Sequence, residues 1–127
     1  MRRSIDERDI EFRGTPGGAL ERFVRLADGR GYAHRCSKQV FEQVAGYLED
    51  HQREGVKIQS ISDAIDAPMT QVNVALQLLT ERGLLEKPAG GGRLEYVAPG
   101  YAQGFYEHAM TEFYALIEGH PPQFREA

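Results

Sequence analysis

The side chains best suited to metal or thiol chemistry gather once in the sequence, at residues 32–38, YAHRCSK. His34 and Cys36 belong to the residue types that ligate zinc, but the chain holds one cysteine, and its other three histidines are widely scattered. Arg35 and Lys38 are cations that could lower the pKa of the Cys36 thiol and make it redox-responsive. Because neither pattern completes a site, we expect an ordinary cysteine, with no metal and no cofactor.

Two other patterns could belong to an enzyme. The glycine-rich residues 14–18 precede an expected helix, as phosphate-binding loops do, but no Lys-Ser/Thr pair follows them. Asp63 and Asp66 could share a helix face, although carboxylates near a helix start are explained by capping and by the helix dipole. No nucleophile has a base at a suitable spacing. We therefore expect a protein that is not an enzyme.

The elements around these residues are mostly helices. Ser37 can cap a helix over residues 38–54, and Ser60 with Asp63 can cap a short helix over 61–66. A third helix over 68–82 can begin at Pro68, and Gly83 provides its left-handed stop. Apolar residues recur at helical spacing in all three. The inward positions of the short helix and the third helix are Ile61, Ala64, Ile65, Val72, Ala75, Leu76 and Leu79.

The period changes to extended after Leu84. Residues 85–87 and 93–97 are strand candidates, and PAGGG at 88–92 supplies the turn between them. Residues 56–58 can form a short strand that pairs with this hairpin. Residues 58–97, with the segment TERGLLEK and the glycine hairpin, resemble the winged helix-turn-helix superfamily. The resemblance implies a mainly α fold with a small β-hairpin wing. The commonest members of this superfamily are bacterial and archaeal transcription regulators.

That resemblance implies double-stranded DNA as a partner. Polar residues on the 68–82 helix are then placed to read base edges, because Asn and Gln form bidentate hydrogen bonds with adenine. These candidates are Thr70, Gln71, Asn73 and Gln77. The candidates for phosphate contacts, in the wing and at the N-terminus, are Lys87, Arg93, Arg2 and Arg3.

A second interpretation uses the same helix differently. Val74 and Leu78 lie one turn apart where relatives often carry basic or polar residues, and Glu81 would repel phosphate. In this alternative the two apolar side chains form a surface for a protein partner, and the winged fold serves as an assembly module without DNA binding.

The remaining segments flank this core. We expect a basic N-terminal arm and short helix over 1–36, with an edge strand at 10–12 and an amphipathic helix at 19–27, then the winged domain over 37–98. Residues 99–127 contain an aromatic helix at 101–118 whose apolar band is broad enough to suggest a homodimer, the alternative being packing within the chain. The dimer candidates are Phe105, Tyr106, Met110, Phe113 and Ile117.

Composition adds bounds on location and partners. The chain has 127 residues and a net charge of −4. Residues 1–38 carry nine Lys/Arg against six Asp/Glu, whereas residues 39–100 and 101–127 both carry more acidic than basic side chains. A DNA-facing surface should therefore recruit the N-terminal arm. No stretch approaches the roughly 20 apolar residues of a membrane span. The charged N-terminus and single cysteine lead us to expect a cytoplasmic protein without a membrane partner.

Overall fold

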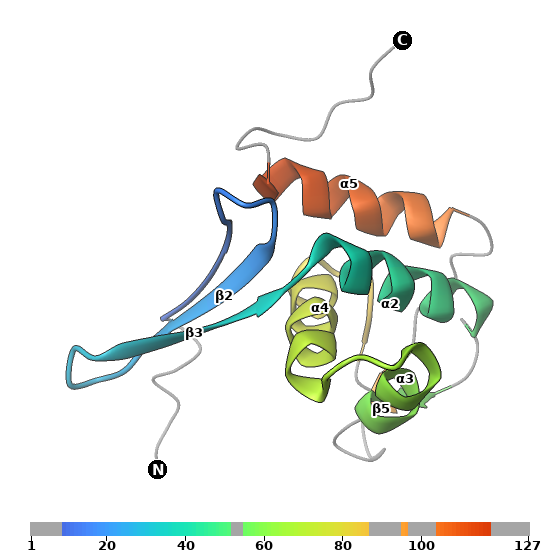
Figure 1. The fold of residues 1–127 in the computed structure, drawn as a ribbon, viewed down its shortest axis with the longest axis horizontal. Helices are drawn as coiled ribbons and strands as arrows, with labels where there is room; N and C mark the ends of the chain where they lie inside the picture. The colour runs from blue at the N-terminus through green and yellow to red at the C-terminus, as the bar shows by residue number, and fades with distance from the viewer. Residues whose placement is uncertain (1–8, 52–54, 87–94, 97–103, 118–127) are drawn as a thin grey trace, which may run out of the picture.

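The computed structural model describes residues 9–51, 55–86, 95–96 and 104–117 (Figure 1). In these ranges the chain is an α+β fold, with four helices, a three-stranded antiparallel sheet and a short strand pair. The strands are β1 (Ile10–Gly14), β2 (Leu20–Arg25), β3 (Gly31–Cys36), β4 (Val56–Lys57) and β5 (Glu95–Tyr96). The helices are α2 (Lys38–Asp50), α3 (Ile58–Ile65), α4 (Met69–Glu81) and α5 (Phe105–Ile117). None of these helices has the length and apolar character needed to span a membrane.

The N-terminal segment forms a sheet of order β1-β2-β3, so the predicted helix over 19–27 is wrong. Leu20, Arg22 and Val24 alternate along β2 and are buried on one side of the sheet. Turns with Gly18 and Gly29 at positive φ bound the segment, and β2 pairs on both sides, with β1 and with β3. These two rows of backbone hydrogen bonds satisfy the segment as a strand. The edge strand expected at 10–12 is confirmed as part of β1.

The helix signals were partly correct. Ser37 caps α2, since its Oγ accepts a hydrogen bond from the Val40 N–H at 3.1 Å, and Gly83 follows α4 with a φ of 83°. Helix α3 starts at Ile58 rather than at residue 61, so Ser60 lies inside the helix and the predicted cap by Ser60 and Asp63 is wrong. Pro68 is the N-cap of α4, one position before its first turn.

Burial in α3 also differs from the prediction. Ala64, expected to face inward, is exposed, whereas Ser62 is buried and its hydroxyl donates a hydrogen bond to the Ala67 carbonyl. The buried residues Ile58, Ile61 and Ser62 share one helical face, and Ala64 lies to the side of it.

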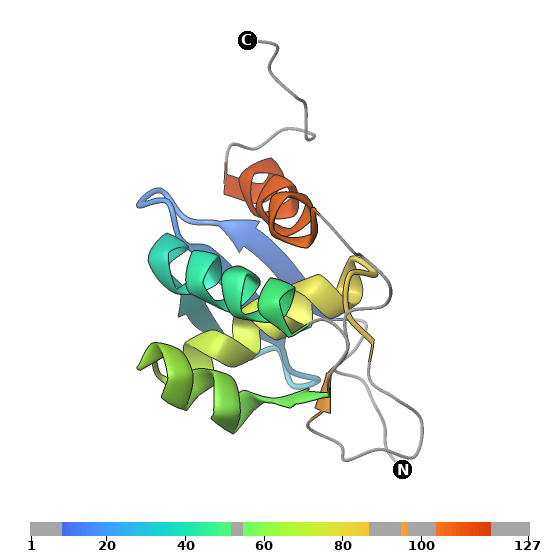
Figure 2. The same cartoon turned by 90° about the vertical axis from the view of Figure 1, so that its right-hand side faces the viewer.

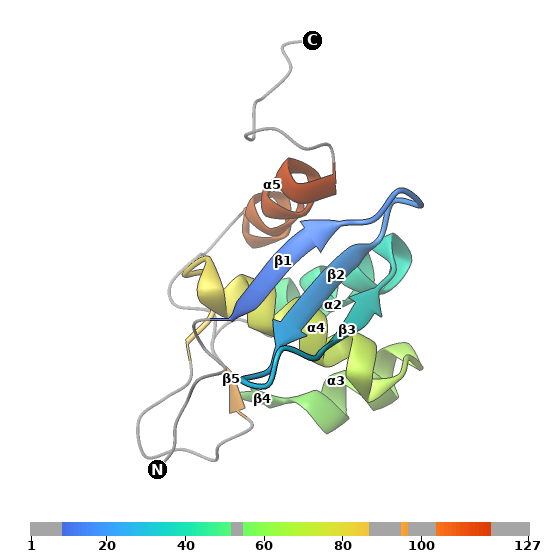
Figure 3. The same ribbon diagram turned by 90° about the vertical axis from the view of Figure 1, so that its left-hand side faces the viewer.

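Helix α4 lies between the helical core and the N-terminal sheet. It contacts α2 and α3 on one side and β2 and β3 on the other, and Figure 3 shows it crossing behind the sheet. Figure 2 shows α2 between α5 and α3, which completes the helical layer. Six residues of α4 are consequently buried.

The short strand pair joins the segment after α2 to the segment before α5. Val56 pairs with Tyr96 and Lys57 with Glu95 in antiparallel register, as predicted for a strand that pairs with the wing segment, but the strand ends at Lys57 because Ile58 begins α3. The expected hairpin turn at 88–92 lies outside the described residues.

Helix α5 packs within the chain against α2 and β1. Phe105 and Phe113 are fully buried, and the Phe113 ring lies 4.8 Å from the Phe41 ring. Gly14 allows β1 to approach α5, because a Cβ there would lie 2.7 Å from the Ile117 Cα. The expectation that Phe105 and Phe113 anchor a dimer is therefore wrong: both side chains already fill the core of one chain, as does Met110.

Candidate nucleic-acid interface

One polar stripe on α4 remains open to solvent. Thr70 is exposed, and Asn73 and Gln77 are half-buried at spacings of three and four residues, so they lie on one side of the helix. Thr80, on the same side, donates its hydroxyl to the Leu76 carbonyl at 2.8 Å. Three of the four predicted base-reading residues thus lie together, and we call Thr70, Asn73 and Gln77 the amide stripe.

Gln71 lies on another side of α4 and is bonded to the backbone of the same chain. Its Oε1 accepts a hydrogen bond from the backbone N–H of Ser37 at 3.0 Å, which ties α4 to the junction between β3 and α2. The roughly 100° rotation per helical residue turns Gln71 away from Thr70 and toward the sheet. This contact separates Gln71 from the other three predicted base-reading residues.

Val74 and Leu78 are both 0% exposed, so neither belongs to a surface. They flank the Gln71 side of α4, which is bonded to Ser37 at the end of β3, and β2 and β3 both contact this helix. The proposed protein-binding surface formed by these two side chains is therefore wrong. Their apolar character is explained by the N-terminal sheet, which takes the place of a partner.

The surroundings of the amide stripe are acidic. Residues 55–86 carry Lys57 and Arg82 against four carboxylates, a balance of −2. Arg82 is already paired, with Glu81 at 2.8 Å and with Glu112 of α5 at 2.9 Å. The predicted phosphate contacts Arg2, Arg3, Lys87 and Arg93 lie outside the described residues.

A basic surface lies on the sheet instead. Arg13, Glu21 and Arg35 stand opposite one another on β1, β2 and β3. The two Glu21 carboxylate oxygens accept hydrogen bonds from the Nε atoms of Arg13 and Arg35 at 2.8 and 3.1 Å. These hydrogen bonds, with Arg13 contributing most and Arg35 next, hold the pKa of Glu21 below its ordinary value.

Phe23 lies beside the row of Arg13, Glu21 and Arg35, on the same face of the sheet. The guanidinium carbons of Arg13 and Arg25 lie 4.7 and 5.4 Å from the centre of its ring. Such distances are typical of cation–π contacts. The sequence reasoning missed this surface because it assigned residues 19–27 to a helix, although the alternation of Glu21, Phe23 and Arg25 was a signal for it.

The candidates for metal and thiol chemistry did not converge. No group of three or more metal-ligating side chains occurs within the described ranges. Cys36 is fully buried, and burial raises the pKa of its thiol to about 12, so the redox-responsive interpretation is wrong. The Arg35 side chain is bonded to Glu21 on the outer face of the sheet, whereas Cys36 lies on the other face. Arg35 therefore does not stabilise a thiolate at Cys36.

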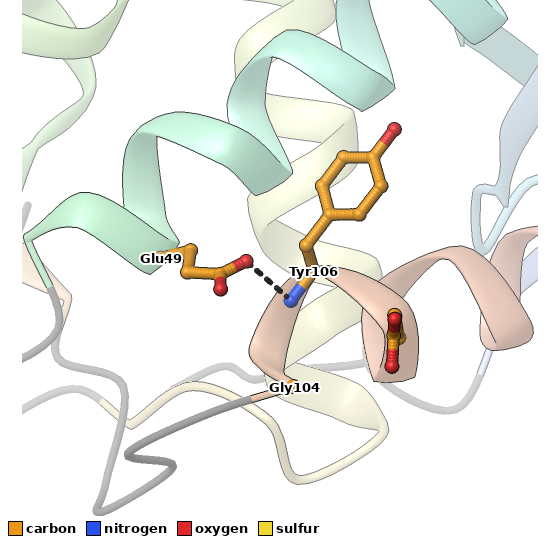
Figure 4. A pocket seen from close by; sticks show the side chains of 4 residues that line it. Glu49, Gly104 and Tyr106 are labelled. Atoms are coloured by element: carbon orange, nitrogen blue, oxygen red, sulfur yellow. Dashed lines mark hydrogen bonds between the residues drawn. The ribbon is translucent and has the colours of Figure 1, made fainter.

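The carboxylates considered for catalysis have structural positions. Asp63 accepts a long hydrogen bond from Gln59 at 3.4 Å, and Asp66 ends α3 with a φ of 56°. A separate open hollow is lined by Glu49, Gly104, Tyr106 and Glu107, and there Glu49 caps α5 by accepting a hydrogen bond from the Tyr106 N–H at 3.1 Å (Figure 4). Asp63 is thus bonded within α3, Asp66 ends α3 and Glu49 caps α5.

Comparison of the chain with protein-family models, with curated proteins and with solved structures gives no match.

Proposed function

We propose that this chain is a DNA-binding transcription regulator of the winged helix type that acts as a homodimer. The order α2, β4, α3, α4 and β5, with β5 paired to β4, supports the fold assignment. In this arrangement α4 is the helix that enters the major groove, whose width of about 12 Å admits one α-helix.

The amide stripe carries the proposal. The core and the sheet bury the other sides of α4, and the side left open displays Thr70, Asn73 and Gln77. Asn and Gln each offer a donor and an acceptor in the geometry that adenine presents in the major groove. Two such amides at i and i+4 supply base contacts without any charge.

Phosphate binding must come from other segments, because the surface around the stripe is acidic. Arg2, Arg3, Lys87 and Arg93 are the proposed phosphate contacts. Each phosphate neutralised releases about one counterion, so the affinity should fall steeply with salt.

The proposed dimer interface is formed by the side chains of α5 that are not fully buried in the core of one chain. Tyr106 and Ile117 are half-buried and keep part of their apolar surface accessible. Phe113→Glu would place a charge in the core and unfold the chain, so the dimer is better tested with Ile117→Glu. Sedimentation equilibrium should show a lower mass for this variant than for the wild-type protein if α5 forms the interface.

The DNA-binding experiment is fluorescence anisotropy with duplex fragments of promoter length from the host, titrated across salt. Asn73→Ala and Gln77→Ala should each weaken binding to a selected fragment about tenfold, because a bidentate pair contributes about 1–3 kcal/mol of base discrimination. Binding to random duplex should change little.

Gln71→Ala is the matched control, since it removes the same amide from another side of the same helix, where Gln71 is bonded to the Ser37 backbone. It should lower stability and leave DNA affinity unchanged. Equal losses on selected and random DNA for the stripe variants, or a Gln71 effect as large as theirs, would contradict the assignment.

A further inference from the structure

The three-stranded sheet has a face that points away from α4. Side chains alternate between the two faces of a strand, so Arg13, Phe23, Arg25 and Arg35 share the face opposite to Leu20 and Val24. We call these four residues the arginine face. Leu20 and Val24 are buried on the other side, which leaves the arginine face as the outer surface of the sheet.

A buried carboxylate holds two of the arginines in place. The Glu21 side chain is only 11% exposed, while those of Arg13 and Arg35 are 45% and 69% exposed. Each arginine reaches Glu21 through Nε, and the Nη1 of Arg13 also lies 4.0 Å from Glu11. Guanidinium groups carry further N–H donors on their terminal nitrogens, so these arginines are positioned with donors available for a second anion.

The Phe23 ring reaches toward β3 and lies close to two cations. A Cβ on Gly31 would lie 2.6 Å from the Phe23 Cζ, so the glycine leaves the room that the ring occupies over β3. The guanidinium carbons of Arg13 and Arg25 both lie within 5.4 Å of the centre of this ring. An aromatic surface and guanidinium planes therefore meet at one place, and both stack on nucleobases.

The sheet is also the one described part with a positive balance. Its outer face carries Arg13, Arg25 and Arg35 against Glu11 and Glu21, a balance of +1, whereas Arg22 is buried on the other face. Residues 37–51, 55–86 and 104–117 each have a balance of −2. A polyanion approaching the described surface is thus attracted to the sheet and repelled elsewhere.

We propose that the arginine face binds single-stranded nucleic acid, with phosphates on Arg13, Arg25 and Arg35 and a base stacked on Phe23. Arg13 and Arg35 stand on the two edge strands, with Cα atoms about 10 Å apart, so a strand can cross the sheet between them. A single strand fits better than a duplex, because paired bases are stacked on each other and present no open face to Phe23. This function goes beyond duplex recognition by α4, since it uses the opposite side of the sheet and does not depend on it.

The first test uses a fluorescent reporter at the proposed stacking position. The chain contains no tryptophan, so Phe23→Trp introduces a single indole on the arginine face. An oligothymidylate of about twelve nucleotides should quench its emission saturably. Tyr32→Trp is the matched control, because Tyr32 pairs with Val24 and therefore lies on the other face of the same sheet. Equal quenching of both variants, or no saturable quenching of Phe23→Trp, would overturn the proposal.

The second test keeps Phe23 and measures anisotropy of the labelled oligothymidylate. Arg25→Ala and Arg35→Ala should each weaken binding about fivefold and reduce the slope of log affinity against log salt by about 0.7. Arg30→Ala removes the same charge from the β2–β3 turn, where Arg30 is paired with Asp28, and should have little effect. A loss with Arg30→Ala equal to the others would show only a general charge effect and refute the face.

Two further comparisons separate this proposal from duplex recognition by α4. Asn73→Ala should leave oligothymidylate binding unchanged, and Arg35→Ala should leave base discrimination on duplex unchanged. A duplex of the same length that quenches Phe23→Trp as strongly as the single strand would contradict the preference for single strands.

Discussion

Replacing Leu78 with alanine tests whether the N-terminal sheet covers α4. Leu78 is 0% exposed, and the substitution removes three buried carbons. At about 0.8 kcal/mol for each buried methylene, the loss of transfer free energy is about 2.4 kcal/mol. The cavity left behind adds to this, since the sheet and α4 cannot fully close it, and we expect a total of about 3 kcal/mol.

The assay is urea unfolding followed by circular dichroism. With an m-value of about 2 kcal/mol/M, the midpoint should fall by about 1.5 M. Met69→Ala is the matched control, because Met69 lies on the same helix and is 40% exposed. Its free energy of unfolding should change by about 0.5 kcal/mol or less. If Leu78→Ala were as mild as Met69→Ala, Leu78 would lie on a surface after all, and the interpretation of α4 as a covered helix would fail.

Three other predictions concern the sheet. Glu21→Gln should lower the free energy of unfolding by about 1 kcal/mol at neutral pH, because Arg13 and Arg35 lose a charged acceptor. Since the pKa of Glu21 is depressed in the folded state, the difference in stability between the wild type and this variant should be full above about pH 4.3 and should shrink as the pH falls further. A difference that does not change with pH would contradict the ion pairs. Cys36, with a pKa of about 12, should react with a thiol reagent at pH 8 only when the chain unfolds, and rapid labelling of the native protein would show that the thiol is not buried. Arg22 is 9% exposed and its Nε has no hydrogen-bond partner among the described residues, so Arg22→Leu should raise the urea midpoint, whereas a loss like that of Leu78→Ala would reveal a missed contact.

The candidate site was only partly predictable from the sequence. Thr70, Asn73 and Gln77 follow from helical spacing, because the helix that carries them has strong local signals. Gln71 has the same chemistry, but its partner is the backbone of Ser37, 34 residues earlier, and no local pattern shows that contact. The arginine face was missed for a related reason, since its three strands act together only after they pair.

Local signals in the sequence by themselves determined where most helices lie. The cap at Ser37, the stop at Gly83 and the apolar period between Val72 and Leu79 are properties of neighbouring residues, and the structure agrees with them. They persist in the fold because hydrogen bonds and side-chain contacts within a helix join residues only a few positions apart.

The tertiary structure alone decided what covers these helices. Residues 20–25 fit both a helical and an extended pattern, and pairing with β1 and β3 selected the strand. From the sequence, Val74 and Leu78 were expected to form an exposed apolar patch. In the structure both are buried, and the same sheet contacts the helix that carries them. Burial depends on which distant segments meet, and the free energy that decides it comes from apolar area removed from water across the whole fold rather than from any local run of residues.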